Sequence, residues 1–519
     1  MEYTTKKEII RTERRPDVYC ESSLDYTLPD YDTDVRKILF TDAIVRPAGK
    51  FVGDGEVELS GIVVYTVVYT DNENKLKSVT FSSDYDLTAK CSTDNLSEVV
   101  CDTRVSNYAI RLLGPRRISA RASIAESICA SYTEELEIAG DAFLGDEHPE
   151  VSEEGIAYER IREISPLERE YAEPIAELDG AIADEVNVIF SDAEVIFDKA
   201  VVEDGGVTAS GDILITAIIK SYEEPARLYT KVIPFEESLT CEGLSDGAVC
   251  LPTATVSSLA SSINALDTGS EVVISLIVEF GAVCEYNERE RIVSDAYLKS
   301  ASVENSYGEL SYGEVVYSGR ERDSFSTELS RSEMLPDSMR EIVFLKATPR
   351  LEHCECTATG VEIKGEIKYA GVSSELCDDG SVLYSPIKFS APYSKNVNID
   401  SQNAEDLRVG VKLYTNRTNA TLDASSLYVS GDVECEITVV APKKIKRLTS
   451  LSVGERDAEV HSSRITVYYP SEGDSLFSVA KRFRTSGEKI ALDNSLVSSV
   501  SADGREEFSL TGVKKLIIS

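Results

Sequence analysis

The sequence is poor in histidine, in basic residues and in long apolar runs, and each shortage excludes a class of function. It has three histidines, His148, His353 and His461, which leaves few candidates for a catalytic base. Lysine and arginine number 53 against 91 acidic residues, giving a formal net charge of −38 and a field that repels phosphate backbones and anionic lipid. No apolar run approaches the roughly 18 residues that a spanning helix requires. We therefore expect no nucleic-acid partner and no transmembrane segment.

The first residues and the cysteines indicate a compartment. The start, "MEYTTKKEIIRTERRPD", is polar throughout and shows no signal peptide, so we predict a cytoplasmic localisation. In that reducing environment the eleven cysteines are expected to be free core thiols rather than disulfides. The run His353-Cys354-Glu355-Cys356 has a metal-like spacing, but a strand would send both cysteines to one face and His353 to the other. We expect neither a metal nor a cofactor.

A six-residue motif occurs three times. It reads "ILFTDA" at 38–43, "VIFSDA" at 188–193 and "IVFLKA" at 342–347, and a glycine follows each copy at the same distance, at Gly61, Gly211 and Gly365. Apolar residues alternate around each glycine, which is typical of a half-buried antiparallel strand. A glycine in the middle of a strand indicates a bulge or a close approach of the neighbouring backbone.

The motif marks a repeated unit. Later alternating runs recur in each copy, and "DAFL" at 141–144 is answered by "DAYL" at 295–298. The repeat is about 150 residues long, mostly strand. We predict a mainly β fold of three repeated β-sandwich or barrel-like units, with boundaries at 1–150, 151–305 and 306–442, then a basic linker at 443–462 and a small domain at 463–519. The segment from 303 to 325 could be edge strand or linker.

The small domain begins with letters that also open a family of serine esterases, Gly473-Asp474-Ser475-Leu476. An esterase serine needs a base, which that family supplies from a histidine downstream, and no histidine follows Ser475. The same letters suit the start of a helix, where Asp474 or Ser475 would accept hydrogen bonds from its first turn. Apolar residues follow at helical spacing, and Thr485 with Glu488 predicts a second capped helix. We expect a strand, two helices and a closing strand at 514–519, and no enzyme.

This pattern closely resembles a LysM domain, a small βααβ module whose Gly-Asp-Ser/Thr-Leu hallmark is matched by residues 473–476. LysM domains usually recognise N-acetylglucosamine polymers in a groove between two loops. The resemblance implies that Gly473, Asp474, Ser475, Leu476, Phe477 and Asn494 form a partner-binding or glycan-binding groove.

The upstream units resemble the SPOCS domain of endospore-forming bacteria, through "LPDYDTDVRKILFTDA" at 28–43 and the strand around the glycine. SPOCS units followed by one LysM are similar to a family of spore-coat morphogenesis proteins. The resemblance implies a non-enzymatic scaffold in the mother cell, at the forespore surface. Its LysM would dock an ATPase like stage IV sporulation protein A, in the basement layer of the coat, and other coat proteins or a second copy could also bind. The alternatives are recognition of peptidoglycan or cortex glycan and, less favoured, a wall hydrolase.

Overall fold

The computed structural model confirms a mainly β fold. It describes residues 2–139, 147–203, 205–221, 224–241, 243–244, 247–330, 341–378, 381–399, 406–423, 425–456, 465–500 and 506–519. Within these ranges almost every element is a strand, and the two α-helices are short and lie near the C-terminus. No described helix is long and apolar enough to cross a bilayer.

The first strand set makes two facing antiparallel sheets. One sheet has β4 between β3 and β5. In the other sheet, β7 pairs with β6 along one edge and with β2 and β1 along the other. Apolar side chains of β4 and β5 pack against those of β7 between the sheets. The strands are β1 (Glu2–Arg14), β2 (Val18–Thr27), β3 (Lys37–Gly53), β4 (Glu56–Thr70), β5 (Leu76–Lys90), β6 (Leu96–Gly114) and β7 (Arg117–Ala139).

Two further strand sets repeat this order. In the second, β10 lies between β9 and β11, and β13 lies between β12 and β8; in the third, β16 lies between β15 and β17, and β19 lies between β18 and β14. The second set comprises β8 (Glu150–Asp179), a 3₁₀ turn (Ala183–Glu185), β9 (Asn187–Glu203), β10 (Gly206–Lys220), β11 (Arg227–Thr240), β12 (Val249–Leu266) and β13 (Gly269–Tyr297). The third comprises β14 (Ala301–Ser330), β15 (Glu341–Thr357), β16 (Gly360–Leu376), β17 (Val382–Asn398), β18 (Arg408–Leu422) and β19 (Ser426–Arg456).

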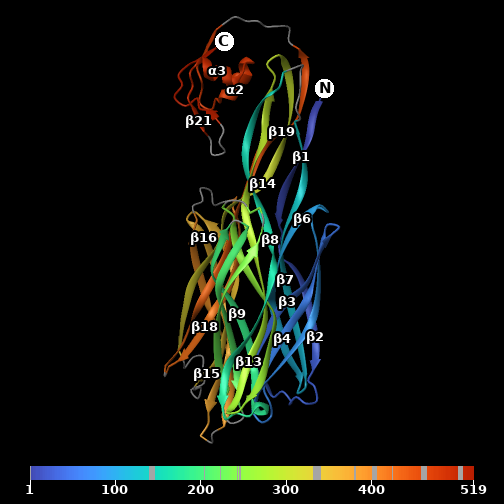
Figure 1. Cartoon of the computed structure of the whole chain (residues 1–519), viewed down its shortest axis with the longest axis vertical. Coiled ribbons are helices and arrows are strands. Elements are labelled where there is room, and N and C mark those ends of the chain that lie inside the picture. The colour runs from blue at the N-terminus through green and yellow to red at the C-terminus, as the bar shows by residue number, and fades with distance from the viewer. Residues whose placement is uncertain are drawn as a thin grey trace.

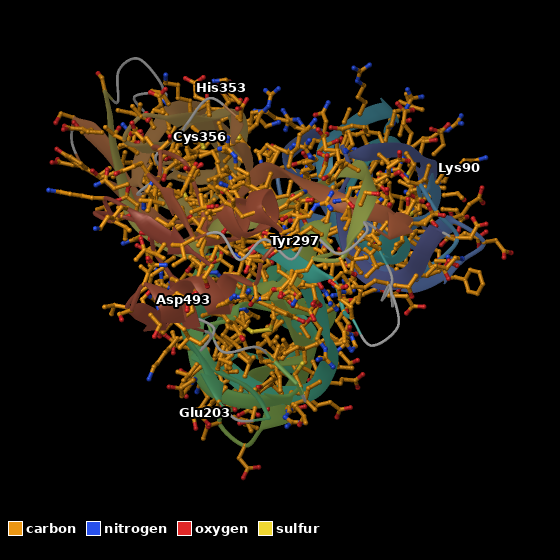
Figure 2. The ribbon with its side chains drawn as sticks, turned by 90° about the horizontal axis from the view of Figure 1, so that it is seen from above. Lys90, Glu203, Tyr297, His353, Cys356 and Asp493 are labelled. Atoms are coloured by element: carbon orange, nitrogen blue, oxygen red, sulfur yellow. A yellow bond between two sulfur atoms is a disulfide. The ribbon has the colours of Figure 1, made fainter. Side chains whose placement is uncertain are left out.

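The longest strands leave the wide body and continue as a narrow stalk (Figure 1). The stalk consists of three antiparallel ribbons, formed by β1 with β7, β8 with β13, and β14 with β19. Seen from above, the body has three lobes, one from each strand set (Figure 2). A separate apolar cluster fills the stalk, with Ile9, Leu136, Ile156, Tyr158, Ile292 and Leu310 at its centre.

The repeated motif lies where the three lobes meet. Phe40, Phe190 and Phe344 occupy equivalent motif positions, and their ring centroids lie 4.8 to 5.4 Å apart. Two residues after Phe344, Lys346 Nζ donates to Asp192 Oδ2 at 2.7 Å and to Asp42 Oδ2 at 2.8 Å. We call these six residues and the aliphatic side chains around them the axis cluster. The three copies of the motif therefore hold the strand sets together.

The motif-linked glycines occur at bulges and close approaches, as their position in the strands predicts. The pairing with the preceding strand shifts register beside Gly61, Gly211 and Gly365. A Cβ at any of them would collide with a carbonyl oxygen of that strand, from Arg46, Ile196 or Arg350 respectively. These positions therefore require glycine because the neighbouring backbone is close, which needs no catalytic or binding role.

The structure corrects one expectation from the sequence and decides another that was left open. The stretch 443–456, expected to be linker, is the end of β19, and residues 457–462 lie outside the described residues. Its basic residues hid the alternation: Lys444 pairs with Glu309 at the surface, while Leu448 and Leu451 are buried. The segment 303–325, left open as edge strand or linker, is strand within β14, which pairs with β19 and lies at the edge of its sheet, so the first alternative is confirmed.

The cysteines also differ in part from the expectation of free thiols. Cys250 and Cys284, directly opposite each other on β12 and β13, form a disulfide, and the other nine are free. His353 and Glu355 contact each other on one side of β15, as the strand alternation requires. No described group of three or more potential ligands is arranged to hold a metal ion.

A small α/β module follows the stalk and lies beside it (Figure 1). We call its described residues, 465–500 and 506–519, the C-terminal module. Its strands β20 and β23 pair antiparallel, and β21 and β22 form a separate hairpin between α3 and β23. The elements are β20 (Thr466–Tyr468), α2 (Leu476–Phe483), α3 (Gly487–Asp493), β21 (Ser498–Val500), β22 (Glu506–Phe508) and β23 (Leu516–Ile518).

Candidate functional site

The loop before α2 holds the first two predicted groove residues in a turn. Gly473 has a φ of +92°, a conformation that glycine adopts without strain. The Asp474 carboxylate accepts hydrogen bonds from the Ser471 N–H and the Tyr468 hydroxyl, both at 2.7 Å. These two donors, the N–H of Ser471 first, lower the pKa of Asp474 below its ordinary value. Asp474 therefore fixes the loop to β20.

Ser475 is the N-cap of α2. Its Oγ accepts from the Ser478 N–H at 3.0 Å, and Ser478 Oγ accepts from the Ser475 N–H at 3.0 Å. This reciprocal pair is a capping box, which satisfies two N–H groups that the helix start would otherwise leave free. The arrangement fits the sequence-based prediction of a cap and gives no support to a nucleophile.

The second helix is capped one residue later than predicted. Ser486, not Thr485, accepts a hydrogen bond from the Lys489 N–H. Thr485 instead closes the end of α2, because its N–H donates to the Ala480 carbonyl, and its own carbonyl accepts from the Tyr297 hydroxyl.

Asn494 joins the end of α3 to β23. Its amide nitrogen donates to the carbonyls of Ile490, at 2.8 Å, and Ile517, at 2.7 Å. Its Oδ1 accepts from the Ile517 N–H at 2.6 Å. The side chain thus braces the module internally, and its contacts are with α3 and β23 rather than with the loop at 473–475.

Leu476 and Phe477 belong to the apolar core of the module. They pack beside the buried residues Val479 and Ala480, which lie on the helical stripe that the spacing predicts. Phe477 also contacts the end of the stalk: its ring lies edge-on to Tyr297 with centroids 5.3 Å apart. A residue expected to line an open groove is therefore partly covered from within the chain.

The end of β13 docks this module. Tyr297 is 4% exposed and belongs to the module's apolar cluster, and its hydroxyl donates to the Thr485 carbonyl at 2.7 Å. Lys481 pairs with Asp295 at 2.5 Å. Burial opposes the charge of Asp295, yet hydrogen bonds from Lys481 and Tyr307 hold its pKa below its ordinary value.

The docking of the module on β13 was not predicted from the sequence, although the sequence marks the residues that make the contact. Asp295 and Tyr297 are the first and third residues of "DAYL", which we noted only as a repeat marker. The matching "DAFL" at 141–144 lies outside the described residues.

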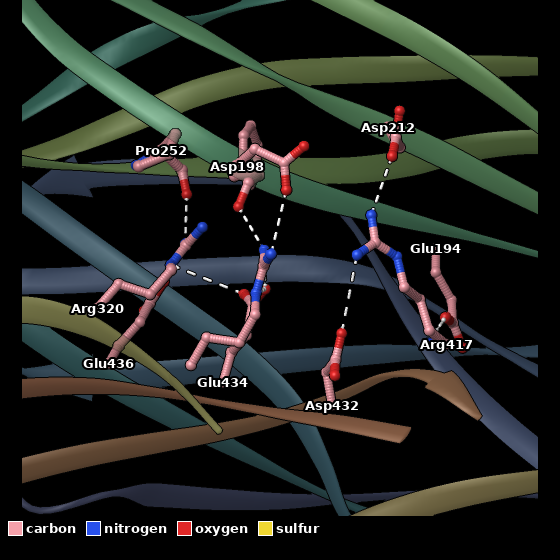
Figure 3. Close-up of polar contacts among 11 residues, drawn as sticks. Glu194, Asp198, Asp212, Pro252, Arg320, Arg417, Asp432, Glu434 and Glu436 are labelled. Atoms are coloured by element: carbon pink, nitrogen blue, oxygen red, sulfur yellow. Dashed lines mark hydrogen bonds and ion pairs between the residues drawn. The ribbon is translucent and has the colours of Figure 1, made fainter. Parts of the chain in front are cut away.

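A cavity lies between the second and third strand sets, next to the polar contacts drawn in Figure 3. The cavity, of about 340 Å³, is lined by Arg320 and Arg322 together with Phe197, Asp198 and Pro252. Arg322 donates to Glu434 and to Asp198, while Arg320 donates to Glu436 and to the Pro252 carbonyl. The arginine charges are already matched by carboxylates from both sets, so these contacts account for cohesion between lobes rather than for a ligand.

Nearby, Arg417 extends the same polar interface, since it pairs with Asp212 and its N–H donates to Glu194 (Figure 3).

Comparison with known proteins gives no relative: no family model, no curated protein and no solved structure matches this chain.

Proposed function

We propose that this chain is a non-enzymatic scaffold, built from three repeated β-sandwich units, that presents a LysM-like binding module. The observation that carries the proposal is the docking of the module on the end of β13 through Tyr297 and Asp295. An elongated body joined by the axis cluster would hold the module at a fixed place and orientation. A rigid support of this kind suits an adaptor, because a binding surface that is already positioned loses less entropy on association.

The proposed partner is an ATPase like stage IV sporulation protein A, in the basement layer of a spore coat. The support is the resemblance of the chain to SPOCS-repeat proteins that end in a LysM domain. The place of action would be the mother-cell cytoplasm at the forespore surface. Other coat proteins, or further copies of this chain, would bind the body.

Glycan recognition is the second candidate, and one observation favours it. Gly473 and Ser475 remain exposed in the loop where LysM domains meet sugar. Against it, Phe477 turns its ring toward Tyr297, and Asn494 uses both ends of its amide within the module. We therefore place protein binding first.

The test is a titration of the full-length chain against the purified ATPase and, separately, against an N-acetylglucosamine oligomer. We expect saturable binding to the ATPase and none to the sugar. Glu472→Arg, in the exposed loop, should weaken binding to the ATPase, whereas Glu203→Arg, at an exposed position in the body, should not. Sugar binding without ATPase binding would replace the proposal with the second candidate.

A further inference from the structure

The β20–β23 sheet has one face packed on the helices and one uncovered face. Tyr468, Leu516 and Ile518 point toward the module's apolar cluster. The intervening residues point outward and are strongly exposed: Ile465 by 72%, Val467 by 49%, Tyr469 by 68% and Ile517 by 39%. We call these four residues the outer face. Val467 and Ile517 lie in the two strands, and Ile465 and Tyr469 flank β20 on the same face. Four large apolar side chains side by side are more than scattered surface hydrophobics and indicate an interaction site.

The two edges of this sheet are not equivalent. On β23, the N–H and the carbonyl of Ile517 are both bonded by the Asn494 side chain, so this edge is closed. Because both groups of Ile517 point away from β20, Ile517 and its register partner Val467 form a non-hydrogen-bonded pair. The N–H and carbonyl of Val467 must then point away from β23 as well. In the described part of the chain no strand pairs with that edge of β20.

The charge beside the outer face is positive. Lys514 and Lys515 are exposed, and neither forms an ion pair with another described residue. The register Tyr468 with Leu516 places Lys515 next to Tyr469, at one end of the outer face. A ligand that covers this face therefore meets apolar side chains along its length and a cation at one end.

We propose that the edge of β20 accepts an extended, acidic and apolar strand from a partner protein. Main-chain hydrogen bonds to Val467 would add the segment as a third strand beside β20, as in other strand-addition complexes. Alternate side chains of the segment would extend the outer face. Most of them would be apolar, and a carboxylate at the end beside Tyr469 would lie within reach of the long Lys515 side chain, one strand further across the sheet. The surface is distinct from the loop at 473–477, and the inference does not depend on the identity of the scaffold's partner.

A binding assay on the full-length chain tests this directly. The probe is a short fluorescein-labelled peptide in which valine alternates with serine and a glutamate takes the last valine position, so that the carboxylate lies on the same face as the valines. The readout is fluorescence anisotropy. We expect saturable binding that a peptide with N-methylated backbone amides loses, because methylation removes the donors that strand addition needs. Failure of the probe to bind, or equal binding of the methylated peptide, would overturn the proposal.

Matched variants at one position separate main-chain from side-chain effects. Val467→Pro removes an N–H that points out of the sheet and leaves the bonds of Thr466 and Tyr468 to β23, so we expect binding roughly tenfold weaker. Val467→Ala keeps the N–H and should weaken binding only about threefold. Lys515→Glu should weaken binding of the glutamate peptide but not of a lysine counterpart. Circular dichroism of each variant checks folding, and the methylated peptide on the unmodified chain remains decisive if Val467→Pro disturbs the module.

Discussion

The axis cluster and the C-terminal module are both places where separate segments meet, but they are held together in opposite ways. In the axis cluster, Phe40, Phe190 and Phe344 come from three distant copies of one motif. In the module, hydrogen bonds such as that between Ser475 and Ser478 span three residues of chain. The body therefore depends on contacts between distant copies of the repeat. The module depends on helix caps, on contacts within its own residues such as that between Asn494 and Ile517, and on Tyr297 at the end of the stalk. Substitutions in the axis cluster should therefore destabilise all three strand sets, whereas substitutions in the C-terminal module should destabilise the module alone.

The third motif differs from the other two in a way that the structure explains. Its lysine, Lys346, stands where the first two copies have Asp42 and Asp192. Burial opposes the charge of Lys346, but the two aspartates outweigh it and raise its pKa above its ordinary value. Three aspartates at this position would repel one another. Because the three copies of the motif belong to one chain, one copy can carry a lysine instead and pair with the other two.

Loss of Lys346 should cause the largest decrease in the stability of the body. Lys346→Met leaves Asp42 and Asp192 together without their cation, and removing one partner of such a network costs about 3–4 kcal/mol. We expect a lower denaturation midpoint for the whole body, measured by the β signal in circular dichroism. The triple variant with Asp42→Asn and Asp192→Asn should recover most of the loss. A local effect confined to the third strand set would contradict the role of the axis cluster.

Truncation of Tyr297, the stalk residue that packs in the module's core, should cause the second-largest loss of stability. Tyr297→Ala removes a buried ring from the module's core and should cost about 3 kcal/mol, but only in the module. Hydrogen exchange should rise in α2 and α3 and remain unchanged in β3 to β5. Tyr297→Phe, which loses only the hydrogen bond to Thr485, is the matched control and should cost about 1 kcal/mol.

Local features were predictable from the sequence, and contacts between distant segments were not. Alternation around Gly61 predicts its strand and bulge, and the residues after Gly473 predict the cap at Ser475, because each depends on near neighbours. The pairing of Lys346 with two aspartates has no local signal, although the repeat marks the position. The lysines of 443–447 masked the inward-facing residues of β19, and Asn494 has a structural role that its letter alone does not reveal.

A buried carboxyl group in the body extends the comparison to pH. Glu126 is 1% exposed, and burial raises its pKa to about 7, whereas Asp474 in the module has a lowered pKa. Between about pH 4.5 and 7 the unfolded chain loses this proton while folded Glu126 keeps it, so its contribution to stability falls as pH rises. Glu126→Gln should therefore stabilise the body by about 3 kcal/mol at pH 8 and by almost nothing at pH 4. Chemical denaturation of both proteins at the two pH values measures this, and an equal difference at both would contradict it.

The smallest loss of stability is expected at Ser475, although its motif, Gly473 to Leu476, also occurs in serine esterases. Ser475→Ala removes the cap oxygen that accepts the Ser478 N–H and should destabilise α2 by about 1 kcal/mol. Ser475→Asp keeps a capping acceptor and should restore most of that stability, although it could not replace a serine nucleophile. Hydrogen exchange at the first turn of α2 measures the cap, and a p-nitrophenyl ester assay on the same proteins measures hydrolysis. Because the cap and the nucleophile predict opposite results for the aspartate variant, retained stability without any serine-dependent hydrolysis assigns Ser475 to the start of the helix, whereas ester cleavage lost in both variants would return it to catalysis.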